Sequence, residues 1–233
     1  MGRVVVFGPH PLLSVTIESR GEADDVHVHA GGQGVWLGRM AAELGADVTL
    51  CGFLGGETGA VLEGLLAELP FAARMTAATG ASGCYVTDRR GEVRHELARQ
   101  VSPPPSRHEL DSLISGTIAA ALGADVLAIC NPFPGDQLPE SVYAELAADA
   151  RAGGTTVIAD LSSPRLDALL PAAPRLVKVN DWELAEFVQG PVDPPELLLA
   201  AARRLQEGGA ETVLVTRGGD PALWRRVRRD ALA

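Results

Sequence analysis

Two glycine-dense turns mark the segment of this chain where ligand chemistry is expected. Gly31-Gly32-Gln33-Gly34 precedes a predicted helix that runs to Leu44, and the run from Gly52 to Gly59 follows a predicted strand. Glycine has no Cβ, so glycines this close together indicate that the backbone approaches another group closely. We predict that this group is a ligand.

Polar residues at the ends of apolar strand-like runs form a second candidate region. Asn131, Asp160, Asn180 and the turn after Thr216 each follow such a run. Ligands of parallel α/β sheets bind beyond the carboxyl ends of the strands. Lys178, the only lysine in an otherwise arginine-rich chain, lies in one of these runs. These strand ends are therefore the positions to test for binding residues.

Alternating strand and helix patterns position these residues. Helices are predicted over residues 107–122, 140–152, 182–188 and 196–207, and strands over 125–130, 156–160, 175–179 and 212–216. Continuous Val/Ile/Leu strands between helices favour a mostly parallel sheet covered on both faces. Half-exposed strands near residues 11–30 and a hairpin within 82–97 favour a small separate sheet. We expect a single α/β domain over 1–233.

Composition and charge exclude several function classes. Apolar residues form 46% of the chain, and the net charge is −10, which argues against a nucleic-acid surface. No apolar run approaches the ~18 residues of a membrane span, so we expect no membrane partner. Cys51, Cys84 and Cys130 lie far apart and are expected to be buried thiols in a reducing compartment, the cytoplasm.

Several motifs occur in an order that resembles the ribokinase-like (PfkB) carbohydrate kinases, nearest their 1-phosphofructokinase and tagatose-6-phosphate kinase branch. The glycine segment Gly31 to Gly59 resembles the first family signature. Leu176 to Leu184 and Val213 to Gly219 resemble two later motifs. The resemblance is collinear from about Arg3 to Leu223.

The resemblance implies ATP-dependent phosphoryl transfer to a sugar or sugar-like hydroxyl, on a ribokinase-like three-layer sandwich with a small β lid. It implies that Asn180 and Glu183 organise Mg²⁺, with Glu183 as the metal residue, and that Lys178 meets the nucleotide phosphates. Thr216, Gly218 and Gly219 would form the ATP-binding turn. A homodimer through the lid is plausible by analogy with such families.

The acceptor positions depart from the family pattern. Ser14 replaces the aspartate that would bind sugar hydroxyls, and a hydroxyl cannot replace a carboxylate's charge. In the glycine turn, which holds Gly31 and Gly32, Gln33 replaces a lysine that would meet a sugar phosphate and Trp36 replaces an asparagine. A neutral or apolar-faced acceptor, or no acceptor, is therefore expected in place of a sugar monophosphate.

The second family signature, Gly-Ala-Gly-Asp, is not found in this sequence. In the family it supplies the anion hole and the catalytic base. Gly218-Gly219-Asp220 directly follows a strand and precedes proline, so we do not identify it with that motif. The basic stretch Leu223 to Asp230 is expected to be a solvated end. We therefore assign no catalytic residue and expect the chain to be C-terminally incomplete.

Three functions stay open. The first is a carbohydrate kinase of diverged specificity. The second is a catalytically inactive kinase-fold protein that acts as a nucleotide- or ligand-binding or regulatory module. A dinucleotide-dependent oxidoreductase ranks far lower, because the turn at Gly31 is not predicted to join a strand to a helix. His27 and His29 share a strand face but have no evident third metal ligand, so exposed residues are the simpler interpretation.

Overall fold

The computed structural model describes residues 2–132 and 138–226 of the chain. It contains two compact units. The first unit comprises Met1–Ala120 and Cys130–Leu138, and the second comprises Ala121–Ile129 and Pro139–Ala233. The single domain expected from the sequence stays a prediction.

The first unit contains a parallel sheet with the strand order β1-β4-β5. These strands are β1 (Arg3–Phe7), β4 (Asp47–Leu54) and β5 (Ala72–Ala77), and the helices of the unit are α1 (Gln33–Glu43), α2 (Gly56–Ala67) and α3 (Arg107–Ala121). Val6 pairs in register with Leu50, and both side chains are fully buried. Continuous apolar residues thus make β1 and β4 the core of this unit.

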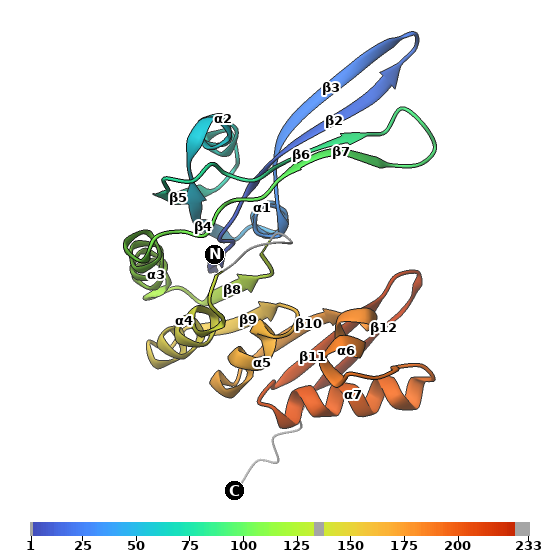
Figure 1. Cartoon of the computed structure of the whole chain (residues 1–233). Coiled ribbons are helices and arrows are strands. Elements are labelled where there is room, and N and C mark those ends of the chain that lie inside the picture. The colour runs from blue at the N-terminus through green and yellow to red at the C-terminus, as the bar shows by residue number, and fades with distance from the viewer. Residues whose placement is uncertain (1, 133–137, 227–233) are drawn as a thin grey trace, which may run out of the picture. The chain divides into compact units, whose positions relative to one another are not determined.

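A second, four-stranded sheet in the same unit has the order β3-β2-β6-β7. Its strands are β2 (Leu12–Arg20), β3 (Ala23–Gly31), β6 (Cys84–Asp88) and β7 (His95–Gln100), and Figure 1 shows β2 and β3 as a long hairpin. We call it the lid sheet. It confirms the small β lid predicted from the sequence, although β7 begins three residues after the predicted Glu92.

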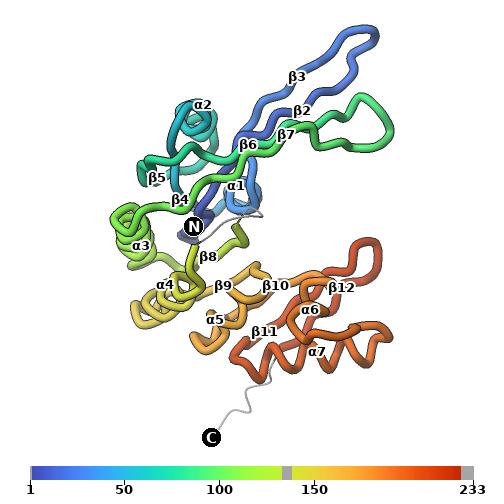
Figure 2. Tube along the Cα trace, viewed as in Figure 1, coloured from blue at the N-terminus to red at the C-terminus, as the bar shows by residue number. Residues whose placement is uncertain are grey.

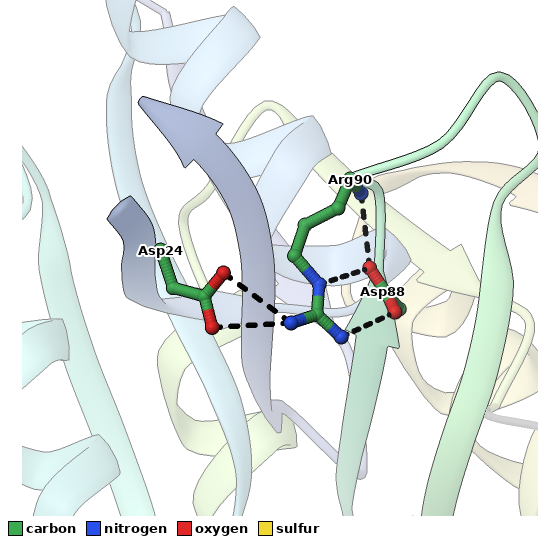
Figure 3. A network of polar contacts seen from close by, with 3 residues as sticks. All are labelled: Asp24, Asp88 and Arg90. Atoms are coloured by element: carbon green, nitrogen blue, oxygen red, sulfur yellow. Dashed lines mark hydrogen bonds and ion pairs between the residues drawn. The ribbon is translucent and has the colours of Figure 1, made fainter. Parts of the chain in front are cut away.

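Arg90 joins the two strands of the lid sheet that flank β2. The guanidinium of Arg90 donates to both carboxylate oxygens of Asp88, at 3.0 and 2.8 Å, and contacts Asp24 at 3.1 Å (Figure 3). These hydrogen bonds lower the pKa of Asp88 to about 2. Since Asp24 belongs to β3 and Asp88 to β6, the arginine fixes the far end of the sheet.

The second unit has the strand order β12-β11-β10-β9-β8. Its strands are β8 (Val126–Cys130), β9 (Thr156–Asp160), β10 (Leu176–Asn180), β11 (Thr212–Arg217) and β12 (Asp220–Arg226), and its helices are α4 (Glu140–Ala152), α5 (Arg165–Leu169), α6 (Asp181–Val188) and α7 (Pro195–Glu207), with a 3₁₀ turn at Leu170–Ala172. Strand β10 pairs in parallel with β9 and β11. The predicted parallel arrangement and helix positions are confirmed.

Strand β12 adds a regular element to the stretch that the sequence predicts to be a solvated end, and most of its residues are exposed. Figure 2 shows the chain turning back from β11 into β12. The two strands pair antiparallel, and Trp224 lies opposite Leu214. Arg225 Nε also donates to Oε1 of Gln206 in α7 at 2.6 Å. The basic residues suggested a solvated tail, but pairing with a buried neighbour decides the conformation. Residues 227–230 of the predicted tail lie outside the described residues.

Within residues 2–132 and 138–226, none of the helices combines the length and the apolar character that crossing a membrane would require.

Candidate functional site

The first unit contains a pocket of about 250 Å³ where β1 ends and α1 begins. His10, Gln33 and Asn131 supply polar groups to it, together with Gly8, Pro9, Pro11, Gly32, Gly34, Val35 and Pro132. The His10 ring stacks on Phe53, with 5.5 Å between the ring centroids. The pocket therefore has a rigid wall and few polar groups, as small-molecule sites commonly do.

Gln33 is held in this pocket by a backbone hydrogen bond. The N–H of Asn131 donates to Gln33 Oε1 at 2.7 Å. The amide nitrogen of Gln33 carries two N–H donors. Neither of them makes a hydrogen bond to the described part of the chain. The carboxamide is thus oriented with a donor available to a ligand, but it has no charge with which to bind a phosphate group.

The glycines of this region approach the chain's own backbone, which corrects part of the sequence interpretation. A Cβ on Gly34 would lie 2.8 Å from the Cα of Gly8, and a Cβ on Gly8 would lie 2.9 Å from the Cα of Gly34. Both distances are too short for any side chain. The pair lets the start of α1 pack directly against the end of β1, so a ligand is not needed to explain these two glycines.

Gly32 precedes α1 with a φ of 101°, a backbone conformation that favours glycine. Strand β3 ends at Gly31, so a strand does lead into this helix, contrary to the sequence expectation. However, β3 pairs antiparallel with β2 in the lid sheet. A dinucleotide fingerprint needs a parallel βαβ unit. The geometry therefore gives the oxidoreductase alternative no support.

Three of the predicted acceptor residues do not line the pocket. Ser14 is 1% exposed within β2, and Gly31 is buried at the end of β3. Trp36 is 53% exposed on α1. The structure thus brings only Gly32 and Gln33 of the predicted acceptor set into one pocket.

Trp36 instead forms a small surface cluster. His29 meets its ring edge-on, with 6.1 Å between centroids, and the Arg39 guanidinium lies 5.3 Å from the ring centre. Burial lowers the pKa of His29, and the positive charge of Arg39 lowers it further. The indole therefore makes a cation–π contact with Arg39 and an edge-on contact with the imidazole of His29.

In the second unit, the predicted nucleotide residues gather at the carboxyl ends of β10 and β11. Asn180 pairs in register with Thr216, and the Thr216 hydroxyl lies 3.5 Å from the carbonyl oxygen of Val179. Lys178 lies two residues earlier on β10, so its side chain projects from the same face of the strand as that of Asn180. The structure thus brings Lys178, Asn180 and Thr216 to one edge of the sheet.

Asn180 and Glu183 form a capping box at the start of α6. The side chain of Asn180 accepts from the N–H of Glu183 at 2.8 Å, and Glu183 Oε2 accepts from the N–H of Asn180 at 2.8 Å. Glu183 is 7% exposed. Glu183 is therefore a largely buried carboxylate, and its place in the capping box gives it a structural role at the start of α6.

Lys178 is paired with Asp160, a partner that the sequence interpretation did not assign. The ammonium lies 3.2 Å from a carboxylate oxygen of Asp160, and Lys178 and Asp160 are register neighbours on β10 and β9. The sequence pattern identifies Asp160 only as a polar residue at the end of a predicted strand. The adjacency of two parallel strands was the signal that could have predicted the pair.

Gly218 and Gly219 form the two-residue turn between β11 and β12. Arg217 pairs with Asp220 across this turn, and Gly218 has a φ of 58°. Glycine is preferred in such tight hairpin turns. Both glycines are exposed at the end of the strand that carries Thr216. The hairpin therefore explains their residue type while leaving them next to the candidate nucleotide edge.

The described residues contain no cluster of three or more His, Cys, Asp or Glu side chains suited to a metal ion. His27 lies 3.5 Å from Asp25 and 3.9 Å from Glu18, which are ion-pair distances. In unit two, Glu183 still offers Oε1, because the capping box uses Oε2. A carboxylate oxygen of this kind fits Mg²⁺, which is commonly held by one or two carboxylates together with substrate phosphates and water.

The two units together contain mostly parallel strands, covering helices and a small separate sheet, which define an α/β protein. A model of the pfkB family carbohydrate kinases matches residues 10–231. The chain belongs to this family, which confirms the resemblance seen in the sequence.

Named relatives agree with the predicted branch. The 1-phosphofructokinase of Haemophilus influenzae is 28% identical over 197 residues, which are 83% of this chain and 61% of that protein. The 1-phosphofructokinase of Rhodobacter capsulatus is 31% identical over 210 residues, which are 88% of this chain and 66% of that protein. The chain thus spans slightly less than two thirds of the length of these relatives.

A solved structure confirms the fold. Phosphofructokinase-2 from Escherichia coli, in complex with potassium, matches with a TM-score of 0.82 and 22% identity. The match covers 98% of this chain and 76% of that one. The α/β fold with a mostly parallel sheet and a small lid is therefore that of the ribokinase-like kinases.

Proposed function

We propose that this protein takes part in ATP-dependent phosphoryl transfer to a hydroxyl of a sugar or sugar-like acceptor. The observation that carries the proposal is the gathering of Lys178, Asn180 and Thr216 at one sheet edge, in a chain of the pfkB family. Phosphoryl transfer asks a protein mainly to position its reactants and to stabilise negative charge. A lysine and exposed glycine amides next to these residues suit that task.

In this proposal the second unit binds ATP. Lys178 contacts the phosphates as a point charge, and the backbone N–H groups of Gly218 and Gly219 bind phosphate oxygens. Glu183 holds Mg²⁺ through Oε1, directly or through water, while Oε2 keeps the helix cap. When bound, Mg²⁺ neutralises charge on the phosphates.

The pocket of the first unit binds the acceptor in this proposal. Gln33 orients a sugar hydroxyl through its free amide donors, and His10 lies in the same pocket. The described lining residues include neither lysine nor arginine. This supports a neutral acceptor over a sugar monophosphate, whose charge would need a cation or several aligned amides.

A phosphotransfer assay tests the proposal. The purified chain is mixed with ATP and a panel of neutral and phosphorylated sugars, with and without Mg²⁺, and ADP release is measured. Any ADP release should depend on Mg²⁺ and be faster with a neutral sugar. Binding of neither ATP nor any sugar, measured in parallel by calorimetry, would contradict the proposal.

A binding protein without turnover is the second candidate. It is favoured by the existing partners of the two charged residues, since Lys178 already pairs with Asp160 and Glu183 already caps α6. No catalytic base is assigned to this chain. Calorimetry that detects ATP binding, combined with no ADP release for any sugar, would favour this candidate. Full turnover by the chain that ends at Ala233 would contradict it.

We also propose a homodimer through the lid sheet and a cytoplasmic location. Val26, Val28 and Leu97 are large apolar side chains exposed on this sheet, which supports an interface there. Cys51 and Cys130 are buried, Cys84 is half-buried, and none of the three forms a disulfide, which suits a reducing compartment. Sedimentation of the wild type and of Val28→Lys tests the dimer, with Val93→Lys, at an exposed position between β6 and β7, as the matched control.

A further inference from the structure

The second unit carries a polar pocket at the amino ends of three neighbouring strands. Its cavity volume is about 360 Å³, which lies within the range of small-molecule sites. Thr156 begins β9, Arg175 directly precedes β10, and Glu211 directly precedes β11. Arg151, in the last turn of α4, also lines it. We call it the amino-edge pocket.

The amino-edge pocket has an excess of positive charge. Arg175 Nη1 donates to Glu211 Oε2 at 2.6 Å, so one arginine is neutralised by one carboxylate. Arg151 makes no ion pair within residues 2–132 and 138–226. The lining residues therefore carry one unbalanced positive charge, in a chain whose net charge is −10.

The side chains of this pocket also supply the free hydrogen-bond donors. The backbone N–H groups of Thr155, Thr156 and Glu211 already donate to carbonyl oxygens. A guanidinium has five N–H donors, and Arg175 uses one of them on Glu211. The exposed hydroxyl of Thr156 makes no hydrogen bond to the part of the chain that the structure describes. The available groups are thus two guanidinium forks and one hydroxyl.

We propose that the amino-edge pocket binds a phosphate group, either as free inorganic phosphate or as part of a small phosphate monoester. Arginine forks bind phosphate oxygens bidentately, and a phosphate offers more acceptor oxygens than a carboxylate does. Arg151 supplies the unbalanced charge, Arg175 keeps its bond to Glu211 and uses its remaining donors, and Thr156 adds a hydroxyl.

This site differs from the proposed ATP site. Arg175 precedes β10 and Asn180 ends it, so the two residues are five positions apart, or about 16 Å along a strand. A phosphate at the amino edge therefore does not contact Lys178 or the capping box. The pocket lies at the edge of the strands opposite to the nucleotide residues.

Backbone amide chemical shifts provide the test, because they report each site separately. Inorganic phosphate and, in a second arm, a sugar phosphate are titrated into the isotope-labelled full chain. We expect saturable shifts at Gly154, Thr155 and Thr156 in at least one arm, and the tighter ligand identifies the source. The Arg151→Ala variant should bind at least tenfold more weakly. Arg203→Ala, at an exposed position of α7 outside the pocket, should bind like the wild type.

A second variant changes affinity in the opposite direction. Glu211→Gln removes the one carboxylate of the pocket while keeping an oxygen that Arg175 can contact, so phosphate should bind more tightly. Tighter binding by this variant and weaker binding by Arg151→Ala would together support the proposal. Saturable shifts in neither arm, shifts confined to Asn180 and its neighbours, or equal affinity in both variants and the wild type would overturn it.

Discussion

Asn180 and Glu183 each bind the backbone N–H of the other, at 2.8 Å in both directions. This reciprocal pair satisfies two N–H groups that have no partner within helix α6. One motif therefore has a structural role that is independent of any ligand. The proposed contribution of Glu183 to Mg²⁺ binding comes from Oε1, the carboxylate oxygen that the capping box does not use.

Substitution of Glu183 separates the two roles. Glutamine can keep the capping box but has no charge, so Glu183→Gln should unfold within about 0.5 kcal/mol of the wild type. Glu183→Ala loses the bond to the Asn180 N–H and should be destabilised by about 1 kcal/mol. Both variants should lose the Mg²⁺ dependence of ATP binding. Urea unfolding and calorimetry measure the two effects, and Mg²⁺-dependent binding by Glu183→Gln would exclude the metal role.

Lys178 offers a test of phosphate binding at the same edge. Replacing its ammonium with the apolar side chain of Lys178→Met should weaken ATP binding by about tenfold, or ~1.4 kcal/mol. AMP, with a single phosphate, should lose less affinity than ATP. Arg203→Met removes a positive charge elsewhere in the same unit and serves as the control for general electrostatics. Equal ATP affinity in the two variants would remove Lys178 from the site.

The sequence predicts the parallel strands and most helices of the second unit well, because their patterns are local. The strand over 156–160 and the helix over 140–152 have the predicted bounds. Ser106 caps the start of α3, where its hydroxyl accepts from the N–H of Glu109 at 3.3 Å, and a serine directly before a helix is a local signal of this kind. Such features depend on a few neighbouring residues, which a sequence displays directly.

Features that depend on distant partners could not be predicted in the same way. Strand β12 looks like a basic tail until β11 pairs with it, and β5 has an exposed, alanine-rich sequence. The Lys178–Asp160 pair requires the order of neighbouring strands. The Gly8–Gly34 contact requires knowing that β1 and α1 pack against each other. In each case tertiary packing, rather than local propensity, decides the structure.

The close contact between Gly8 and Gly34 predicts that a side chain at position 34 lowers the stability of the protein. A second glycine, for which the opposite effect is expected, serves as the control. Gly34→Ala would place a Cβ 2.8 Å from the Gly8 backbone, so overpacking should cost about 1–3 kcal/mol. Gly64→Ala, in the interior of α2 and with nothing within 4 Å of the new Cβ, should stabilise the protein by about 0.5–1 kcal/mol. Thermal unfolding of both variants measures the difference. A Gly34→Ala variant as stable as the wild type would contradict the close backbone contact.

The hydrogen bonds of Glu109 predict how its contribution to the stability of the protein depends on pH. Its carboxylate accepts hydrogen bonds from Thr79 and from the N–H of Ser106, and these bonds lower its pKa from 4.5 to about 2. A lowered pKa in the folded state means that its contribution to stability is present above pH 4.5. That contribution decreases as the pH falls and is lost when the pH passes through about 2.

Substitution of Glu109 tests this pH dependence. Glu109→Gln should be less stable than the wild type at pH 6, and the difference should shrink as the pH is lowered toward 2. Glu63→Gln changes an exposed carboxylate of α2 that makes no ion pair or side-chain hydrogen bond within the described residues. It should show little difference at any pH. Urea unfolding at several pH values measures both variants. A difference in unfolding free energy between Glu109→Gln and the wild type that stays constant with pH would contradict the prediction.

Gln33 tests what the acceptor pocket selects. Its carboxamide has donors but no charge, and the described residues that line the pocket with it include neither lysine nor arginine. Gln33→Lys would introduce a cation into this lining. A charge-assisted hydrogen bond is about twice as strong as a neutral one, so binding of phosphorylated sugars should improve by about tenfold relative to neutral sugars.

The substitution also removes the bond from the Asn131 N–H to Gln33 Oε1, and a matched variant accounts for that loss. Gln33→Met has a similar length, no charge and no acceptor oxygen. If charge decides the selectivity, only Gln33→Lys shifts the preference toward sugar phosphates, while Gln33→Met weakens the binding of neutral sugars. Calorimetry with one neutral sugar and its monophosphate measures the ratio for each variant. An equal ratio in both variants would mean that the Gln33 position does not set the charge preference of the acceptor.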